Sequence, residues 1–115
     1  MALSIEVIGE IDQVVGRWCL ARVPPHLKKS VDYDYEIDGQ TVTIIEVRPA
    51  WQGSPGEVTR RPIARFRFVK LTGQWQIYWM RSSGKWQSYE PMFRASELVD
   101  CLTVLETDNY GCFFG

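Results

Sequence analysis

Apolar and polar positions recur with two different periods along the chain, and the changes of period predict the order of its elements. From residue 4 to residue 23, apolar side chains return every three or four positions, the spacing of an amphipathic helix. The prolines at positions 24 and 25 end that helix. A period of two then predicts strands, and helical spacing returns at residues 96–106, where Ser96 is the predicted N-cap.

The first strands form a predicted hairpin over residues 31–47. Asp38 and Gly39 are typical of the two central residues of a tight turn between antiparallel strands. Counting back from this turn places Tyr35 opposite Val42 on the buried face. The acidic residues that alternate with the tyrosines are then expected on the solvent face of an edge strand.

Three further strands are predicted over residues 63–89, with turns at 72–73 and 83–84. This register places Arg67 opposite Tyr78. The side chains expected to point inward are Phe66, Phe68, Trp75, Ile77, Trp79 and Trp86. Those expected on the open face are Arg65, Arg67, Gln76, Tyr78, Met80, Gln87 and Tyr89.

These elements predict a single α+β domain over residues 1–115. About five antiparallel strands form a meander sheet that packs against an N-terminal and a C-terminal helix. A connection rich in proline and glycine spans 49–62, and a connection of that length is often functional. The apolar tail, 110–115, is expected to be docked on the domain.

Composition narrows the class of protein. The 115 residues are 45% hydrophobic, which suffices for one core. Three scattered cysteines predict a reducing compartment, and the cytoplasm is the expected location. No apolar run approaches the length of about 18 residues that a membrane span needs, and the N-terminus does not resemble an export signal, so no membrane association is expected.

Charge is separated along the chain although the net charge is only −1. Residues 58–89 contain seven cations, seven aromatic residues and no acid. Residues 31–47 contain five acids and no cation. Separated charge produces local fields that can attract a partner.

A set of motifs gives the chain a resemblance to a known family. The run Arg60-Arg61-Pro62-Ile63-Ala64-Arg65-Phe66-Arg67-Phe68, the tryptophans that follow it and the closing Gly-Cys-Phe-Phe-Gly resemble a family of small bacterial proteins catalogued as a domain of unknown function, number 3024. The resemblance covers nearly the whole chain and implies a bacterial cytosolic protein, without an activity. Its signature positions here are Arg48, Trp51, Arg60, Pro62, Arg65, Trp75, Trp79, Trp86 and Tyr89. The chain has Ala50 where the family often has a second proline.

Residues suited to catalysis are few. His26 is the only histidine, which excludes a site with several histidine ligands for a metal. Cys19 lies seven residues earlier, and a buried, unreactive thiol is favoured over a Cys-His pair. The acids of the first strand could hold a hard cation, but a solvated edge is the favoured interpretation. No catalytic residue, metal or cofactor is predicted, and an enzyme with an unrecognised active site is kept as an alternative.

Binding is the function that the residues favour. The candidate binding residues are Arg48, Trp51, Arg60, Arg61, Arg65, Arg67, Tyr78 and Tyr89. Arginine beside aromatic rings suits phosphate contacts and base stacking, so a single-stranded nucleic acid is one hypothesis. The acidic sequence pI of about 5.8 weighs against it. A protein partner or self-association suits the same residue types, and a merely solvated face is the third interpretation. The sequence therefore predicts a small non-enzymatic binding module that uses the open sheet face and the 49–62 connection.

Overall fold

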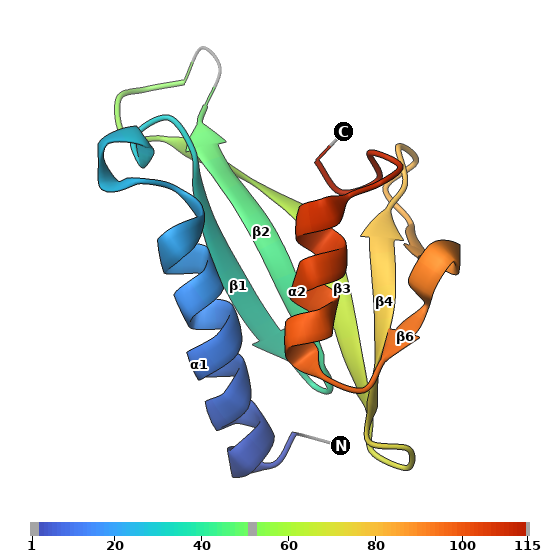
Figure 1. The fold of residues 1–115 in the computed structure, drawn as a ribbon. Coiled ribbons are helices and arrows are strands. Elements are labelled where there is room, and N and C mark those ends of the chain that lie inside the picture. The colour runs from blue at the N-terminus through green and yellow to red at the C-terminus, as the bar shows by residue number, and fades with distance from the viewer. Residues whose placement is uncertain (1–2, 51–52, 115) are drawn as a thin grey trace.

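Two helices cover one face of an antiparallel sheet, and the other face is open (Figure 1). The computed structural model describes residues 3–50 and 53–114. The helices and strands are α1 (Ile5–Arg22), the 3-10 turn η1 (Pro25–Leu27), β1 (Asp32–Asp38), β2 (Thr41–Pro49), β3 (Val58–Val69), β4 (Gln74–Met80), β5 (Trp86–Ser88), the 3-10 turn η2 (Glu90–Met92), β6 (Arg94–Ala95) and α2 (Leu98–Thr107). The strand order is β1-β2-β3-β4-β5, and the short β6 also pairs with β4. The predicted α+β class with two terminal helices is confirmed, with one short strand more than expected.

Both helices begin and end close to the predicted positions. The side chain of Ser4 caps α1 by accepting a hydrogen bond from the backbone N–H of Val7 at 3.3 Å. Ser96 does not cap α2, because Glu97 occupies the N-cap position without a side-chain hydrogen bond. Asp108 ends α2 in the left-handed conformation, with φ of 40°. Among the described residues, no helix is long and apolar enough to cross a membrane.

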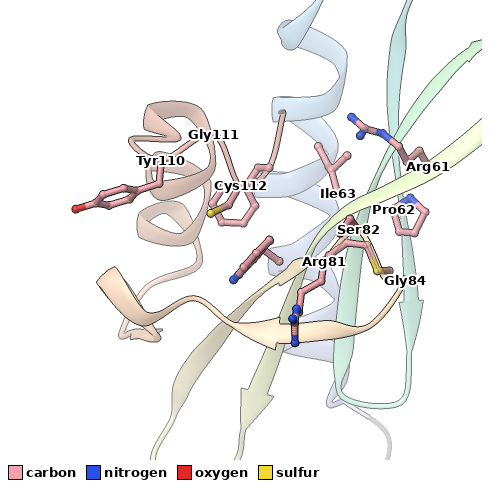
Figure 2. A pocket seen from close by; sticks show the side chains of 12 residues that line it. Arg61, Pro62, Ile63, Arg81, Ser82, Gly84, Tyr110, Gly111 and Cys112 are labelled. Carbon is pink, nitrogen blue, oxygen red and sulfur yellow. The ribbon is translucent and has the colours of Figure 1, made fainter.

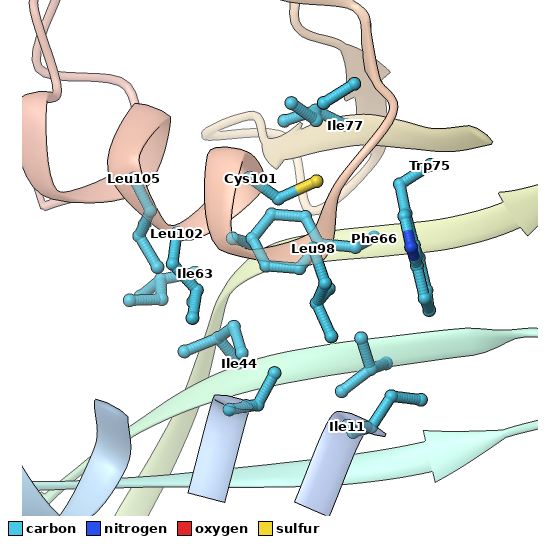
Figure 3. Packing of buried hydrophobic residues seen from close by; sticks show 14 of the residues in the cluster. Ile11, Ile44, Ile63, Phe66, Trp75, Ile77, Leu98, Cys101, Leu102 and Leu105 are labelled. Atoms are coloured by element: carbon cyan, nitrogen blue, oxygen red, sulfur yellow. The ribbon is translucent and has the colours of Figure 1, made fainter. Parts of the chain in front are cut away.

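The core lies between the sheet and the two helices (Figure 3). Leu98, Leu102 and Leu105 of α2 are buried against the centre of the sheet, with Ile44 and Phe66 beneath them. Ile11 and Val15 of α1, both fully buried, cover the β1 side. Burial of side chains of this size contributes about 1.5–3 kcal/mol each, so the contact between helices and sheet stabilises the fold and leaves the opposite face free for other roles.

The first hairpin turn lies one residue later than predicted. Asp38 pairs with Thr41, so Gly39 and Gln40 are the central residues, and Gly39 has φ of +58°. A positive φ at the first central position is characteristic of a type II′ turn, whereas the prediction placed glycine second. Tyr35 consequently lies opposite Ile44 and not Val42. The register is thus shifted by two residues, and because side chains alternate between faces, an even shift preserves the predicted faces.

The β3–β4 connection contains the four residues 70–73, because Val69 pairs with Gln74. Arg65 therefore lies opposite Tyr78, and the predicted pairing of Arg67 with Tyr78 is wrong. The error again amounts to two residues, so the inward and outward faces of both strands are as expected.

The β4–β5 connection is different, because its register error is one residue. Met80 pairs with Trp86, and the backbone N–H of Arg81 bonds the carbonyl of Lys85 at 2.9 Å. A shift of one residue exchanges the two faces of a strand. Trp86 was predicted inside and lies on the open face; Tyr89 was predicted on the open face and is buried in the core.

A bulge in β3 determines where two of the candidate arginines lie. Ile44 pairs with Ala64 and Ile45 with Pro62, so Ile63 is an extra residue in β3. Proline has no N–H to contribute to a ladder, and bulges are among the few places where a sheet tolerates it. Because β3 begins at Val58, the connection is 50–57 and shorter than the predicted 49–62.

Candidate functional site

The predicted binding residues do not form one surface. Arg60, Arg65, Arg67 and Tyr78 belong to the outer face, which is the sheet face opposite the helices. Arg48 and Arg61 lie on the helix side, where both contact Glu46. Tyr89 is a core residue. Trp51 is outside the described residues.

The outer face has an arginine stacked on a tryptophan at its centre. The guanidinium carbon of Arg65 in β3 lies 4.6 Å from the ring centroid of Trp86 in β5. Cation–π contacts of this kind contribute about 0.5–2 kcal/mol, according to their exposure. Arg65 Nε is buried and has no hydrogen-bond partner among the described residues. The stack therefore holds a charged planar group with a donor that its own surroundings do not satisfy.

Arg60 connects the basic and acidic parts of the outer face. Its Nη2 donates to Asp34 Oδ2 at 3.0 Å and to Glu36 Oε1 at 3.1 Å, across β2. The hydrogen bonds to Asp34 and Glu36 raise the pKa of Arg60. These ion pairs are solvent-exposed, so each contributes only about 0–1 kcal/mol to folding. Their main consequence is that much of the charge of Arg60 is already neutralised.

A groove of about 280 Å³ separates the two kinds of charge. Glu36 and Asp38 of β1 border one side, Arg65 and Trp86 border the other, and Ile45 also lines the groove. Beside the groove, Asp38 pairs with Thr41 and Thr41 with Arg67, so acid and base lie in one row across three strands. Neither Asp38 nor Arg67 forms an ion pair within the described residues.

Tyr78 is held on the outer face by a residue of its own strand. Its hydroxyl donates to Gln76 Oε1 at 2.9 Å. Tyr78 and Trp86 are both half-buried. Met80 pairs with Trp86 and lies two residues after Tyr78 on the same face of β4, so the three side chains form an apolar strip along β4 and β5. The outer face thus comprises an acidic strand, a basic strand and an aromatic strip, in that order.

On the helix side, a buried carboxylate binds the two remaining candidate arginines. Glu46 Oε1 accepts from Arg48 Nε at 2.9 Å and from Arg61 Nη2 at 3.3 Å, and Glu46 Oε2 accepts from the Tyr33 hydroxyl at 3.3 Å. Burial favours the neutral form of Glu46, but the hydrogen bond and charge of Arg48 and the charge of Arg61 outweigh it and hold its pKa below the usual value. The carboxylate is therefore ionised at neutral pH, as is required to hold both guanidinium groups.

Arg22 joins the N-terminal helix to the C-terminal tail beside this cluster. Its guanidinium carbon lies 5.0 Å from the ring of Phe114, 5.7 Å from that of Tyr33 and 5.8 Å from that of Trp18. Trp18 Nε1 donates to Glu106 of α2 at 2.8 Å. The expected docking of the tail is thus observed for the described residues up to Phe114.

A larger cleft of about 600 Å³ opens where β4 separates from β3 (Figure 2). The strand residues Arg61, Ile63 and Trp79 line it, together with Cys112 and Phe113 of the tail. In Figure 2 the Tyr110 ring points away from the cleft, and Ile63 and Cys112 lie on facing sides.

Of the two residues considered as a nucleophilic pair, Cys19 is buried and His26 is exposed. Burial, assisted by the negative charges of Asp34 and Asp32, raises the pKa of Cys19 to about 12, so its thiol is protonated at neutral pH. His26 is exposed in η1. In the part of the chain that the structure describes, no three His, Cys, Asp or Glu residues are grouped as metal ligands.

Comparison with known proteins identifies the family. The family described as Domain of unknown function (DUF3024) matches residues 4–115. The chain belongs to DUF3024. The resemblance noted in the sequence is thereby confirmed over nearly the entire chain. No curated protein and no solved structure matches the chain. Because the DUF3024 description gives no activity, a proposal about function depends on the surfaces described above.

The sequence interpretation missed Trp86 and Glu46. The sequence pattern places Trp86 in the core because it predicts a β4–β5 turn that is one residue too short. The same pattern shows Glu46 only as one acid of the 31–47 block. The sequence does contain a signal for Arg61, the partner of Glu46. Pro62 within a central strand indicates a bulge, and a bulge reverses the faces of the residues before it.

Proposed function

We propose that this DUF3024 protein is a small binding module whose outer face binds a protein surface carrying both positive and negative groups. The observation that supports this most directly is the groove that has Glu36 and Asp38 on one side and the Arg65–Trp86 stack on the other. Arginine and aromatic residues grouped on a surface are typical of the energetically important parts of protein interfaces.

The position of the acids favours a protein over a nucleic acid. A nucleic acid presents negative phosphates along its whole length, and its affinity comes mainly from cations that contact them. On the outer face such a strand would meet Glu36 and Asp38 beside Arg65, and the charge of Arg60 is already shared with two carboxylates. A protein surface with alternating charge has no such conflict.

A second copy of the same chain offers a matching surface. In a two-fold symmetric interface the same patch of each subunit meets the other. If the two-fold axis runs over β2, parallel to the strands, β1 of one copy lies over β3 of the other. Asp38 of one copy then faces Arg67 of the other, and this contact occurs twice. The two residues lie in the same row of the sheet and have no ion-pair partner within the described residues.

Sedimentation velocity at low salt tests self-association through this face. We expect the wild-type protein to form dimers with a dissociation constant on the order of 100 μM or below, and to dissociate as salt rises. Arg67→Glu alone and Asp38→Lys alone should each be monomeric, because like charges then meet twice. An equimolar mixture of the two variants should associate again, because opposite charges are restored at both contacts. Arg17→Glu on the exposed side of α1 makes the same charge change away from the face and should dimerise as wild type does.

Two results would contradict the proposal. If the wild type stays monomeric at millimolar concentration, the second copy is not the partner. If the protein instead retards a mixed-sequence single-stranded oligonucleotide and Arg65→Glu with Arg67→Glu abolishes the retardation, the nucleic-acid hypothesis replaces it. The bacterial cytoplasm is the compartment that we propose, and the three free thiols of Cys19, Cys101 and Cys112 support it.

A further inference from the structure

The helix-side cluster has a geometry that suits the binding of a second anion. Arg48 and Arg61 share one oxygen of Glu46, at 2.9 and 3.3 Å, so their guanidinium groups are held close together. A guanidinium has five N–H donors, and each of these hydrogen bonds uses one. The side chains of Arg48 and Arg61 are 58% and 56% exposed, whereas that of Glu46 is 7% exposed. Most donors of both arginines therefore remain available on the solvent side of a buried anchor.

The net positive charge of the cluster also favours the binding of another anion. Two cations share a single carboxylate, which leaves an excess of one positive charge and two like charges held near each other. The Tyr33 hydroxyl bonds the second oxygen of Glu46, so the carboxylate cannot turn to meet each arginine separately without losing that bond. A phosphate group has several acceptor oxygens and pairs with arginine through two parallel hydrogen bonds. It could bridge the two arginines and offset their repulsion.

Arg61 belongs both to this cluster and to the 600 Å³ cleft. The apolar residues Ile63, Trp79 and Phe113 line the cleft together with the polar residues Arg81 and Ser82 (Figure 2 shows Ile63 beside Arg61). Its volume lies in the range of about 300–1,000 Å³ that is typical of small-molecule sites. A molecule whose phosphate contacts Arg61 could therefore bury an organic group in the same cleft.

From these observations we infer that Arg48 and Arg61, positioned by Glu46, bind the phosphate group of a small phosphate monoester, whose flat or apolar organic part occupies the cleft beside Trp79. Arg48, Arg61 and Glu46 lie on the opposite side of the sheet from the outer face, and the inference does not depend on the proposed function.

Isothermal titration calorimetry with phenyl phosphate at constant ionic strength tests the site. We expect saturable binding at one site, with weaker binding of inorganic phosphate and none of phenol, because phenyl phosphate alone uses both the arginines and the cleft. Arg48→Gln and Arg61→Gln should each lower the affinity about tenfold or more, since each removes a charge-assisted contact. Arg17→Gln, which removes an exposed arginine from α1, is the matched control and should retain the affinity within about twofold.

Glu46→Gln distinguishes a site in which Glu46 positions the two arginines from a surface that binds anions only through its positive charge. It raises the net charge of the cluster, so a purely electrostatic site would bind phenyl phosphate more tightly. Loss of the anchor should instead weaken binding if Glu46 positions the arginines. Arg61→Lys, which keeps the charge and loses the planar fork, should behave like Arg61→Gln. Circular dichroism at the titration temperature establishes that each variant is folded.

The inference is overturned by any of four results. These are no saturable binding of phenyl phosphate at 10 mM, on the order of the weakest specific affinities; an equal loss of affinity in Arg17→Gln; tighter binding by Glu46→Gln; or equal affinities for phenyl phosphate and inorganic phosphate, which would leave the cleft without a role.

Discussion

Replacement of Glu46 by glutamine should destabilise the fold by about 2 kcal/mol at neutral pH. The carboxylate is buried and accepts three hydrogen bonds, from Arg48, Arg61 and Tyr33. A net hydrogen bond to a charged group contributes about 1.5–3 kcal/mol, but both arginines are more than half exposed and water can replace the lost contacts. We therefore assign about 0.5–1 kcal/mol to each arginine contact and a similar amount to the tyrosine hydroxyl.

The effect should depend on pH in a defined direction. The folded protein lowers the pKa of Glu46 from 4.5, so the stabilisation is fully present above that value and is lost as the pH falls through the lower, folded-state pKa. Other carboxylates titrate over the same range in both proteins, so their contributions cancel in the difference between wild type and variant. The difference in the free energy of unfolding should be largest near pH 7 and should shrink as the pH falls to about 3.

Urea denaturation followed by tryptophan fluorescence at several pH values measures this difference. For a chain of this length, 2 kcal/mol corresponds to a lowering of the melting temperature by roughly 6–10 °C. Glu36→Gln is the matched control, because Glu36 also pairs with an arginine but its side chain is 63% exposed, and it should cost about 0.5 kcal/mol or less. Equal stabilities of wild type and Glu46→Gln at pH 7, or a difference that widens on acidification, would refute the reasoning.

Three further predictions concern other parts of the molecule. Gly9→Ala should raise the free energy of unfolding by about 0.5–1 kcal/mol in urea titrations, because no described atom beyond its chain neighbours and the backbone of its own helix lies within 4 Å of the added methyl group, and alanine favours the helix; a lower midpoint would contradict this. Asp108→Ala should lower the free energy of unfolding by about 2 kcal/mol and speed hydrogen exchange at Phe113 and Phe114, because their N–H groups donate to the Asp108 carboxylate at 3.1 and 2.9 Å. Asp108→Asn should restore part of the loss, because asparagine tolerates the left-handed conformation. Unchanged exchange in the alanine variant would exclude this role. The stability effects of Arg60→Ala and Arg61→Ala should add within about 0.5 kcal/mol in the double variant, because the two arginines share no partner among the described residues; a coupling above 1 kcal/mol would show that their environments are not separate.

The order and type of the elements could be predicted from the sequence because each segment repeats one hydrophobic period over many residues. The helix of residues 4–23 and the alternating strand around Tyr33 and Tyr35 are long enough for the period to be unambiguous. The faces of β1 to β4 also followed from this period, even though two turns were misplaced. Both errors were of two residues, and an alternating pattern is insensitive to an even shift.

Register beyond those strands could not be predicted because it depends on single residues in turns and bulges. The β4–β5 turn is one residue longer than the pattern suggested, so Trp86 and Tyr89 exchanged roles. Turn length depends on which residue adopts a positive φ, and here that residue is Gly84, with φ of +85°. The sequence shows that a glycine is present but not which position of the turn it occupies.

The bulge at Ile63 has the same consequence for the basic segment. Without an extra residue in β3, strict alternation from Arg65 would place Arg61 on the outer face and Arg60 on the helix side. With it, Arg60 reaches Asp34 and Glu36 on the outer face, and Arg61 reaches Glu46 on the other side. Arginines that are neighbours in the sequence therefore lie on opposite faces of the sheet and contact different acids. Arg60 lies within a mixture of charges, as a protein interface requires, whereas Arg61 lies beside Arg48 with an excess of positive charge, as an anion site requires. A continuous basic segment is thus compatible with two separate binding surfaces, and neither of them needs the extended cationic track that a nucleic acid would need.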